Sequence, residues 1–405
     1  MGNDIFFSLR AIVLWKLTFQ IYPLPDGCIL SIIDTTDVAA NVNYPSDKKL
    51  IGNAFKKVIK EVEKFNEELA SQQLAQFEAD IDREYEGNEK VSVKSHLEIV
   101  KKHLEYLYLK TYAELQINKK YQEAFGICYD IIDQYLNNKK DKIVSVVDPD
   151  ARIAHKSQGN IKRGYKDHII VDEDSEIILG SVQTPFNVGD EKKLAELLGK
   201  VDNDLGLKPE EITADKVYGT SNNRAYLKDN GIISNIDFYE ESSRETSFYK
   251  VRDFIISDDL KQITCPNGIT TKEFIAGYDK TGKRETIKFK FAKATCQSCP
   301  LNDKCLQKYK GGKIHSGRYV VVARRYDAVL HDMKRIETEE FKEAQNKRYK
   351  VERRFATMVR NHGLRRCRYL GLARAKIHIT LANMACNIVR MVNILYPPSF
   401  AVFQN

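Results

Sequence analysis

The sequence lacks any continuous run of about eighteen apolar residues, the length that a helix needs to cross a lipid bilayer. The closest approach is segment 6–24, which Arg10, Lys16 and Gln20 interrupt and which no small-residue cleavage site follows. We therefore expect neither a membrane span nor a secretory signal peptide. A reducing, cytoplasmic environment is the compartment that fits this pattern.

Cysteine is scarce, and half of the eight cysteines fall in one region as Cys265, Cys296, Cys299 and Cys305. Without an export signal, such clustering favours metal ligation over disulfides. The spacing Cys-x30-Cys-x2-Cys-x5-Cys fits a closed, four-thiolate structural zinc site of the zinc-ribbon kind. The alternative is a small β-module with four reduced cysteines. The remaining cysteines are expected to be ordinary buried thiols: Cys28, Cys128, Cys367 and Cys386.

Acidic residues are in deficit mainly at one end of the chain. The 405 residues carry a net charge of +8, and their number predicts two or three domains. Between Ser316 and Tyr396 there are 18 Lys or Arg against 7 Asp or Glu, a surplus of 11. A polyanionic partner for the C-terminal fifth is therefore expected.

Hydrophobic periodicity divides the chain into segments of different type. Patterns with a period of 3.6 predict three or four helices within residues 48–140. Strands are then predicted at Ile143–Val147, at His168–Asp172 paired with Glu176–Val182 as a hairpin, at Glu211–Ala214, and at Ile232–Ile236. Helices are predicted from Asp190, as N-cap, to Val201, from Ser221 to before Gly231, from Asp332 to Asn361, and from Ala375 to Leu395.

Two acids stand where predicted strands end. The apolar run Ile29–Asp34 follows Pro25 and Gly27 and ends in Asp34, and Glu211–Ala214 runs into Asp215. A third acid, Glu352, lies in the predicted long helix beside apolar Val351 and Phe355. Three converging carboxylates can hold two divalent cations about 4 Å apart, which is what phosphoryl transfer on nucleic acid needs. Asp148 is a rival for the first position, although Asp-Pro-Asp is also a turn sequence.

Several stretches together resemble the DDE transposases of bacterial insertion sequences. They are Asp34–Asp47, Asp148–Arg152, Gly164–His168, Thr184–Asp190, Ala214–Gly219, the cysteine group, Val351–Phe355, His362–Gly371 and the helix that contains Asn387. The resemblance implies an RNase H-like (retroviral-integrase) fold of the α/β class: a mixed five-stranded sheet flanked by helices. It also implies a helical insertion after strand 1 and a Cys-rich, zinc-ribbon-like insertion before the last catalytic helix.

By this resemblance Asp34, Asp215 and Glu352 are the catalytic acids and the ligands of two Mg²⁺ or Mn²⁺ ions. The family often arranges residues around the glutamate as Tyr-x2-Arg-x3-Glu-x6-Lys. Arg348 fits the arginine position, but Gln345 and Val359 replace the tyrosine and the lysine. A basic face that follows the glutamate is expected to contact DNA phosphates: Arg348, Arg353, Arg354, Arg360, Arg365, Arg366 and Arg368.

The implied function is transposition: metal-dependent cleavage at the terminal inverted repeats of an element and strand transfer into target DNA. A homodimer acting at the bacterial nucleoid is implied as well. Family members usually carry an N-terminal end-binding domain, so a short start suggests, as an alternative, a catalytically silent DNA-binding remnant. A stand-alone RNase H-like nuclease is a third reading.

These expectations give a domain map with seven parts. They are an N-terminal remnant (1–28), the first catalytic strand and loop (29–47), the helical insertion (48–140), the RNase H-like core (141–240), the Cys-rich insertion (241–330), the C-terminal catalytic and basic helices (331–396) and a tail (397–405).

Overall fold

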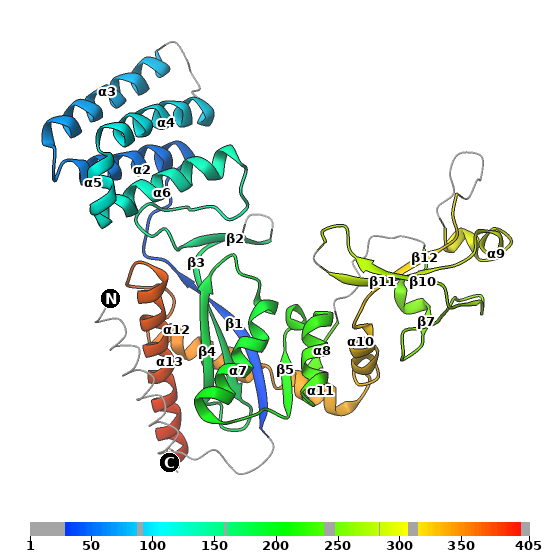
Figure 1. Cartoon of the computed structure of the whole chain (residues 1–405). Helices are drawn as coiled ribbons and strands as arrows, with labels where there is room; N and C mark the ends of the chain where they lie inside the picture. The colour runs from blue at the N-terminus through cyan, green and yellow to red at the C-terminus, as the bar shows by residue number, and fades with distance from the viewer. Residues whose placement is uncertain are drawn as a thin grey trace.

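The computed structural model describes residues 29–86, 92–157, 160–238, 248–282, 284–306 and 315–397. The expected N-terminal remnant (1–28), with Cys28, and nearly all of the expected tail lie outside these residues. Figure 1 shows a helical unit, a central α/β body and a small β-module arranged along the chain. In the part of the chain described, no helix is both long and apolar enough to cross a membrane.

The central body is built on one mixed sheet. Its strands are β1 (Leu30–Ala39), β2 (Arg152–Ser157), β3 (Asn160–Asp172), β4 (Ile178–Pro185), β5 (Glu211–Ala214) and β6 (Ile233–Ile236). Their order is β2-β3-β1-β5-β6, with β4 also paired to β3. Strand β1 runs antiparallel to β3 and parallel to β5, and β6 is parallel to β5. The expected mixed α/β class is therefore confirmed, although the sheet has six strands rather than five.

The additional strand is β2, which pairs with the first residues of β3, while β4 pairs with β3 from Tyr165 onward. The change of partner occurs at Gly164, whose φ is +131°. A Cβ atom at this position would collide with the backbone around the carbonyl oxygen of Val38 on β1. Glycine is required here because only it combines this backbone conformation with so close an approach.

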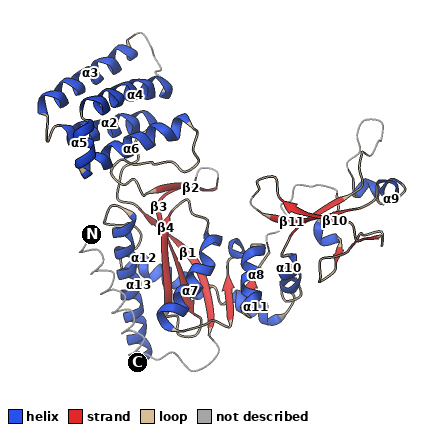
Figure 2. Ribbon diagram, in the orientation of Figure 1, coloured by secondary structure: helices blue, strands red, loops and turns tan. Residues whose placement is uncertain are grey.

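Helices cover both faces of the sheet (Figures 1 and 2). One face packs on α7 (Leu194–Leu205) and α8 (Ser221–Asp229), and the other on α12 (Tyr349–Asn361) and α13 (Leu372–Leu395). Side chains alternate along β1, so Ile33 belongs to the α7 side and Ile32 to the α12 side. Asp34 therefore lies on the same face as Ile32, toward α12.

The helical insertion consists of five helices between β1 and β2. They are α2 (Asp47–Val62), α3 (Glu67–Tyr85), α4 (Val93–Lys110), α5 (Tyr112–Ile117) and α6 (Lys119–Leu136). Three of them begin at residues whose side chains accept a hydrogen bond from the first turn: Asn66, Ser92 and Asn118. The insertion has a hydrophobic core of its own that includes Phe55, Leu107 and Ile131.

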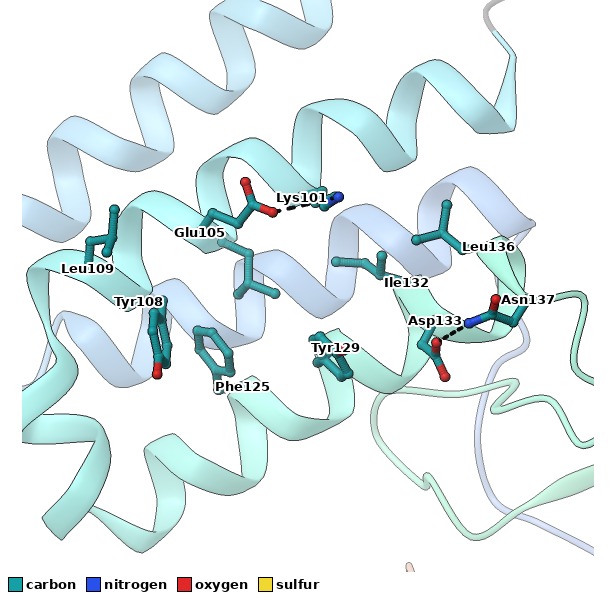
Figure 3. A pocket seen from close by; sticks show the side chains of 11 residues that line it. Lys101, Glu105, Tyr108, Leu109, Phe125, Tyr129, Ile132, Asp133, Leu136 and Asn137 are labelled. Carbon is teal, nitrogen blue, oxygen red and sulfur yellow. Dashed lines mark hydrogen bonds and ion pairs between the residues drawn. The ribbon is translucent and has the colours of Figure 1, made fainter.

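An open groove runs along the insertion between α4 and α6. Figure 3 shows Tyr108 of α4 and Phe125 and Tyr129 of α6 lining it together. Lys101 and Glu105 form an ion pair of 3.7 Å at its edge. Leu109 is 77% exposed, so the described residues leave this apolar surface uncovered.

The Cys-rich module (residues 248–323) forms two small three-stranded sheets. Its strands are β7 (Ile255–Ile256), β8 (Ile263–Thr264), β9 (Thr270–Thr271), β10 (Phe274–Tyr278), β11 (Glu285–Lys290) and β12 (Tyr319–Ala323), with α9 (Lys293–Gln297) between the last two. A third core, around Phe254, Ile263 and Phe289, holds the two sheets together.

Two expectations about the later helices are wrong. The single helix from Asp332 to Asn361 is in fact three helices: α10 (Tyr326–Met333), α11 (Glu339–Asn346) and α12. Helix α11 begins anew because Thr338 caps it, accepting from the backbone N–H of Phe341. The helix expected from Asp190 starts as a 3-10 turn and becomes α7 at Leu194. Asp190 does not cap it, because its carboxylate accepts from Lys166 Nζ at 2.7 Å.

The strand expected at Ile143–Val147 is also wrong, since this stretch is irregular. Its backbone groups bond to a helix instead of a sheet. Gln134 of α6 accepts from the N–H of Ile143 at 2.8 Å and donates to its carbonyl oxygen at 3.1 Å. The apolar residues therefore continue the packing of the helical insertion.

Candidate active site

The sequence pattern had indicated that Asp34 ends its strand. In the structure Asp34 lies in the middle of β1. Strand β1 continues to Ala39, and Asp34 stands opposite Ile169 of β3. On the other side, Ile33 is in register with Ala214, the last residue of β5. Asp34 and Asp215 therefore occupy the next positions on neighbouring parallel strands, which are about 4.8 Å apart. We refer to them as the acid pair.

One guanidinium group faces both members of the acid pair. An Arg348 nitrogen lies 3.3 Å from Asp34 Oδ2, and another lies 3.9 Å from Asp215 Oδ1. Each carboxylate also accepts, at 2.7 Å, the backbone N–H of the residue that follows it. Arg348 was expected to contact DNA, whereas in this structure it supplies the positive charge between the two acids.

The surroundings of Asp34 disfavour its charged form. Burial raises the pKa of the Asp34 carboxyl, and the nearby charge of Asp215 acts in the same direction. The Thr35 N–H and the Arg348 guanidinium oppose this rise without cancelling it. A carboxylate in this position gains from a bound cation, because the cation offsets the cost of burying a negative charge.

Glu352 lies one helical turn beyond Arg348, on the same face of α12. Val351 and Phe355, on either side of it, are buried against the sheet, whereas Glu352 itself is exposed. Among the described residues, no three acidic, histidine or cysteine side chains are gathered closely enough to hold a metal ion. The structure therefore brings Asp34 and Asp215 together around Arg348, and Glu352 does not join them in a three-acid group among the described residues.

Asp148, the rival for the first position, is fully buried in the core. Both of its carboxylate oxygens accept from the hydroxyl of Tyr165, at 2.6 and 2.7 Å. Its neighbour Asp150 accepts from the N–H of Leu372 at the start of α13. These contacts tie the Asp-Pro-Asp turn to the fold, and none of them involves the acid pair.

A hydrogen-bonded network behind the acid pair was missed at the sequence level. On the opposite face of the sheet, Thr35 Oγ1 lies 2.6 Å from the hydroxyl of Tyr218 and 2.9 Å from Nδ1 of His168. Thr35 follows Asp34, and Tyr218 lies three residues after Asp215, so this bond connects the two acid-bearing segments. The one sequence signal for this network is that its residues closely follow an acid in the chain.

His168 is not suited to act as a base. Burial lowers its pKa to about 3, and the positive charges of Lys166 and Lys193 add to the effect. Its second ring nitrogen lies 2.9 Å from Thr184 Oγ1. The neutral ring therefore connects neighbouring strands through hydrogen bonds to Thr35 and Thr184.

Two of the arginines that were expected to contact DNA have a partner within the protein. Arg353 and Arg354 both contact the buried carboxylate of Glu176, in the turn between β3 and β4. Arg390 of α13 approaches the same carboxylate at 3.7 Å. Arg354 is itself buried, whereas Arg353 is exposed, so the contact with Glu176 gives both an internal partner and leaves Arg353 open to solvent.

The other four arginines of the expected DNA face are exposed: Arg360, Arg365, Arg366 and Arg368. The last three lie in the loop after α12, which is bonded to the end of β1. Ala39 donates to the carbonyl of Arg365 at 3.1 Å and accepts from the N–H of Cys367 at 2.7 Å. No carboxylate of the described residues forms an ion pair with any of the four.

Gln345, which replaces the tyrosine of the family pattern, has a structural partner. Its side-chain amide donates to the carbonyl oxygens of Ala214 and Asn235, at the ends of β5 and β6. These bonds hold α11 against the strand ends directly beside Asp215. Glutamine at this position therefore helps to hold the strand end next to Asp215 in place.

The four clustered cysteines line one small cavity in the Cys-rich module. All four are free thiols, and the backbone N–H of Arg318 donates to Cys296 Sγ at 3.4 Å. Burial raises the pKa of Cys305, which also senses the other three sulfurs. Thiolates are donors that suit a soft divalent metal, but among the described residues these four do not form a group that could hold a metal ion.

Comparisons with known proteins add a family for the C-terminal part. Residues 264–392 match a family model described as a transposase DDE domain. The match begins at the end of β8, after Asp34 and Asp215, and stops within α13, and it includes the four cysteines and Glu352. It supports a DDE transposase family and hence a DNA-cleaving class of enzyme that uses divalent metal ions. No curated protein and no solved structure matches the chain.

Proposed function

We propose that this protein is a transposase of a bacterial insertion sequence, acting through an RNase H-like core. The observation that carries the proposal is the convergence of Asp34 and Asp215 on one cation, Arg348, at adjacent parallel strands. The sheet order, in which β1 lies between an antiparallel β3 and a parallel β5, supports the core assignment. The family match supports the reaction class.

The chemistry follows from the residues at the acid pair. Asp34, Asp215 and Glu352 would hold two Mg²⁺ or Mn²⁺ ions, which when bound activate the attacking oxygen and stabilise the leaving one. Asp34 is half-enclosed by protein, which keeps its carboxylate aimed in one direction. Arg348 neutralises the pair before metal enters, and it can then turn to a DNA phosphate. Glu352 lies four residues after Arg348, which contacts both aspartates, and this spacing supports its proposed role as the third ligand.

Replacement of one acid tests the proposal. We expect Asp215→Asn to abolish Mg²⁺-dependent nicking and strand transfer on a duplex carrying the terminal repeats of the element. The reason is that an amide cannot supply the anionic oxygen that the metal requires. Lys216→Gln, a charge change at the adjacent residue, serves as the matched control. Full activity of Asp215→Asn would refute the assignment.

A catalytically silent DNA-binding protein is the second candidate. It is favoured by the exposure of Glu352 outside a three-acid group in the described residues. The two candidates differ in metal binding. Stabilisation of the wild-type chain by Mn²⁺, lost in both Asp34→Asn and Glu352→Gln, supports the enzyme. Equal melting temperatures with and without Mn²⁺ support the silent form.

We also propose a structural zinc ion for the Cys-rich module, held by Cys265, Cys296, Cys299 and Cys305. The support is that four free thiols line one cavity and that a backbone N–H points at one sulfur. Such a site would be closed and would leave no position for substrate. A homodimer acting at the nucleoid remains part of this proposal, because two element ends must be joined in one complex.

A further inference from the structure

A polar cavity of about 470 Å³ lies where the helical insertion meets the sheet. Segments from both sides line it. Tyr44 comes from the link between β1 and α2, Tyr135 from α6, Lys140 and Lys142 from the link between α6 and β2, and Arg163 from β3. We call it the junction cavity.

The junction cavity has an excess of positive charge. Its one lining carboxylate, Asp47, accepts from the hydroxyl of Tyr135 at 2.6 Å, and lining Arg152 is paired with Asp141. Lys140, Lys142 and Arg163 have no carboxylate partner among the residues described. The ammonium group of Lys142 stands 5.0 Å above the ring of Tyr135 instead. Three cations therefore share the cavity without a counter-ion.

Two buried polar atoms at the cavity have no hydrogen-bond partner in the part of the chain that the structure describes. They are Nε of Arg163 and the hydroxyl of Tyr44. The guanidinium of Arg163 lies 4.9 Å above the Tyr44 ring, so the two groups hold each other in place. A buried polar atom without a partner is destabilising, so such atoms call for an explanation, such as a bound ligand.

We propose that the junction cavity binds a backbone phosphate of DNA. A phosphate offers several anionic acceptors, so it can accept from the guanidinium of Arg163, the hydroxyl of Tyr44 and the lysine ammonium groups together. The proposal rests on the proposed function, since it takes the polyanion to be the DNA that the acid pair cleaves.

The position of the cavity relative to the acid pair supports DNA as the source of the phosphate. In β3, Arg163 lies six residues before Ile169, and Ile169 stands opposite Asp34. This spacing corresponds to about 20 Å along the strand, or about six base pairs of duplex. Burial raises the pKa of Tyr44 to about 12, and the negative charge of Asp148 contributes to this rise. The positive charges of Arg163 and Arg366 oppose it.

The salt dependence of DNA binding tests the proposal. The full chain is titrated without divalent metal against a labelled 40-base-pair duplex of mixed sequence at several salt concentrations. We expect Arg163→Gln and Lys142→Gln each to lower the slope of log affinity against log salt by about one, since each removes one phosphate contact. Lys60→Gln, at an exposed position of α2, is matched in charge and should leave the slope unchanged.

Three results would overturn the proposal. The first is a slope in both variants equal to that of wild type and Lys60→Gln. The second is that inorganic phosphate binds the wild-type chain by calorimetry, and Arg163→Gln removes this binding, while the duplex slope stays the same. The cavity would then take a free small anion. The third is that the wild-type chain binds no duplex.

Two further controls make the result decisive. If Arg163→Gln fails to fold, Lys142→Gln decides, because this change affects a partly exposed side chain in a linker. Failure of the proposed function can be told apart from failure of the cavity proposal. In that case the chain binds duplex with the expected slopes but does not cleave it when Mg²⁺ is added. In a cleaving complex, ethylation of the phosphate about six base pairs from the nick should interfere with binding.

Discussion

Asp167 of β3 is fully enclosed and has no cation beside it. Its two oxygens accept from the side-chain amides of Gln183, at 2.9 Å, and Asn383, at 3.0 Å. Burial raises its pKa from 3.8 to about 7, against the effect of these two bonds. Asn383 Oδ1 is buried and without a partner, so a flipped Asn383 amide could accept the proton of a neutral Asp167.

This residue should make stability fall as pH rises. Between 3.8 and about 7 the folded chain holds a proton on Asp167 that the unfolded chain has released. The contribution is therefore fully present below 3.8 and lost by about pH 7, with a limit of about 4 kcal/mol. We expect Asp167→Asn to remove this slope from urea unfolding curves measured between pH 4.5 and 8. Parallel curves for variant and wild type would contradict the prediction.

The sequence allowed the acid pair to be predicted, but not the partners of the arginines. An apolar run that meets an acid is a local signal, and two such runs gave Asp34 and Asp215. Arg353 and Arg354 looked like a basic surface because Glu176, their partner, lies in a distant turn. Contacts between residues so far apart in the chain leave no trace in a single sequence.

At the scale of elements, Glu176 fixes α12 to the sheet. It occupies a left-handed position (φ +58°) in the turn between β3 and β4 and is almost completely buried. Three arginines from α12 and α13 surround its carboxylate: Arg353, Arg354 and Arg390. Because Arg353 and Arg354 directly follow Glu352, this anchor sets where the turn that carries Glu352 stands.

Loss of the anchor should be costly. We expect Glu176→Gln to lower the free energy of unfolding by about 3–5 kcal/mol, since it leaves the buried guanidinium group of Arg354 without a counter-ion. Glu173→Gln is a useful comparison, because Glu173 has a single ion-pair partner, Lys347, at 2.6 Å. Chemical denaturation of both variants provides the measurement. A smaller loss for Glu176→Gln than for Glu173→Gln would show that the arginines find other partners.

Elements were predictable where the pattern was local and complete. Strand β5 and the last helix came out close to their expected bounds, and the hairpin was found where expected, although β3 begins at Asn160 and not at His168. The segment of α10 to α12 did not, because its helical period continues through Thr338 while the chain turns there to place α11 over the ends of β5 and β6. Strand β2 is amphipathic and polar, so it lacked the apolar signal of a strand.

At the scale of the whole molecule, the helical insertion, the central body and the Cys-rich module each have separate hydrophobic cores. Little apolar area is shared between them. Each is therefore expected to lose its structure without forcing the others to do so, as cooperative units generally do.

Metal removal tests this independence together with the zinc proposal. We expect about one zinc per chain by elemental analysis, as a single four-thiolate site requires. Cys299→Ser should lose it, whereas Cys386→Ser, outside the module, should retain it. Chelation should expose residues 248–323 to protease while the far-ultraviolet helix signal stays intact. A wild-type chain without zinc, or a collapse of all helices on chelation, would contradict the prediction.

The placement of the helical insertion also orders events in time. Strands β1 and β3 form the centre of the sheet, yet the whole insertion is synthesised between them. Because closing a long loop costs entropy, β1 must wait until the insertion has folded and brought its two ends together. Glu352 leaves the ribosome later still. A nascent chain therefore contains Asp34 first, then Asp215, and only afterwards Glu352, the acid proposed to join them.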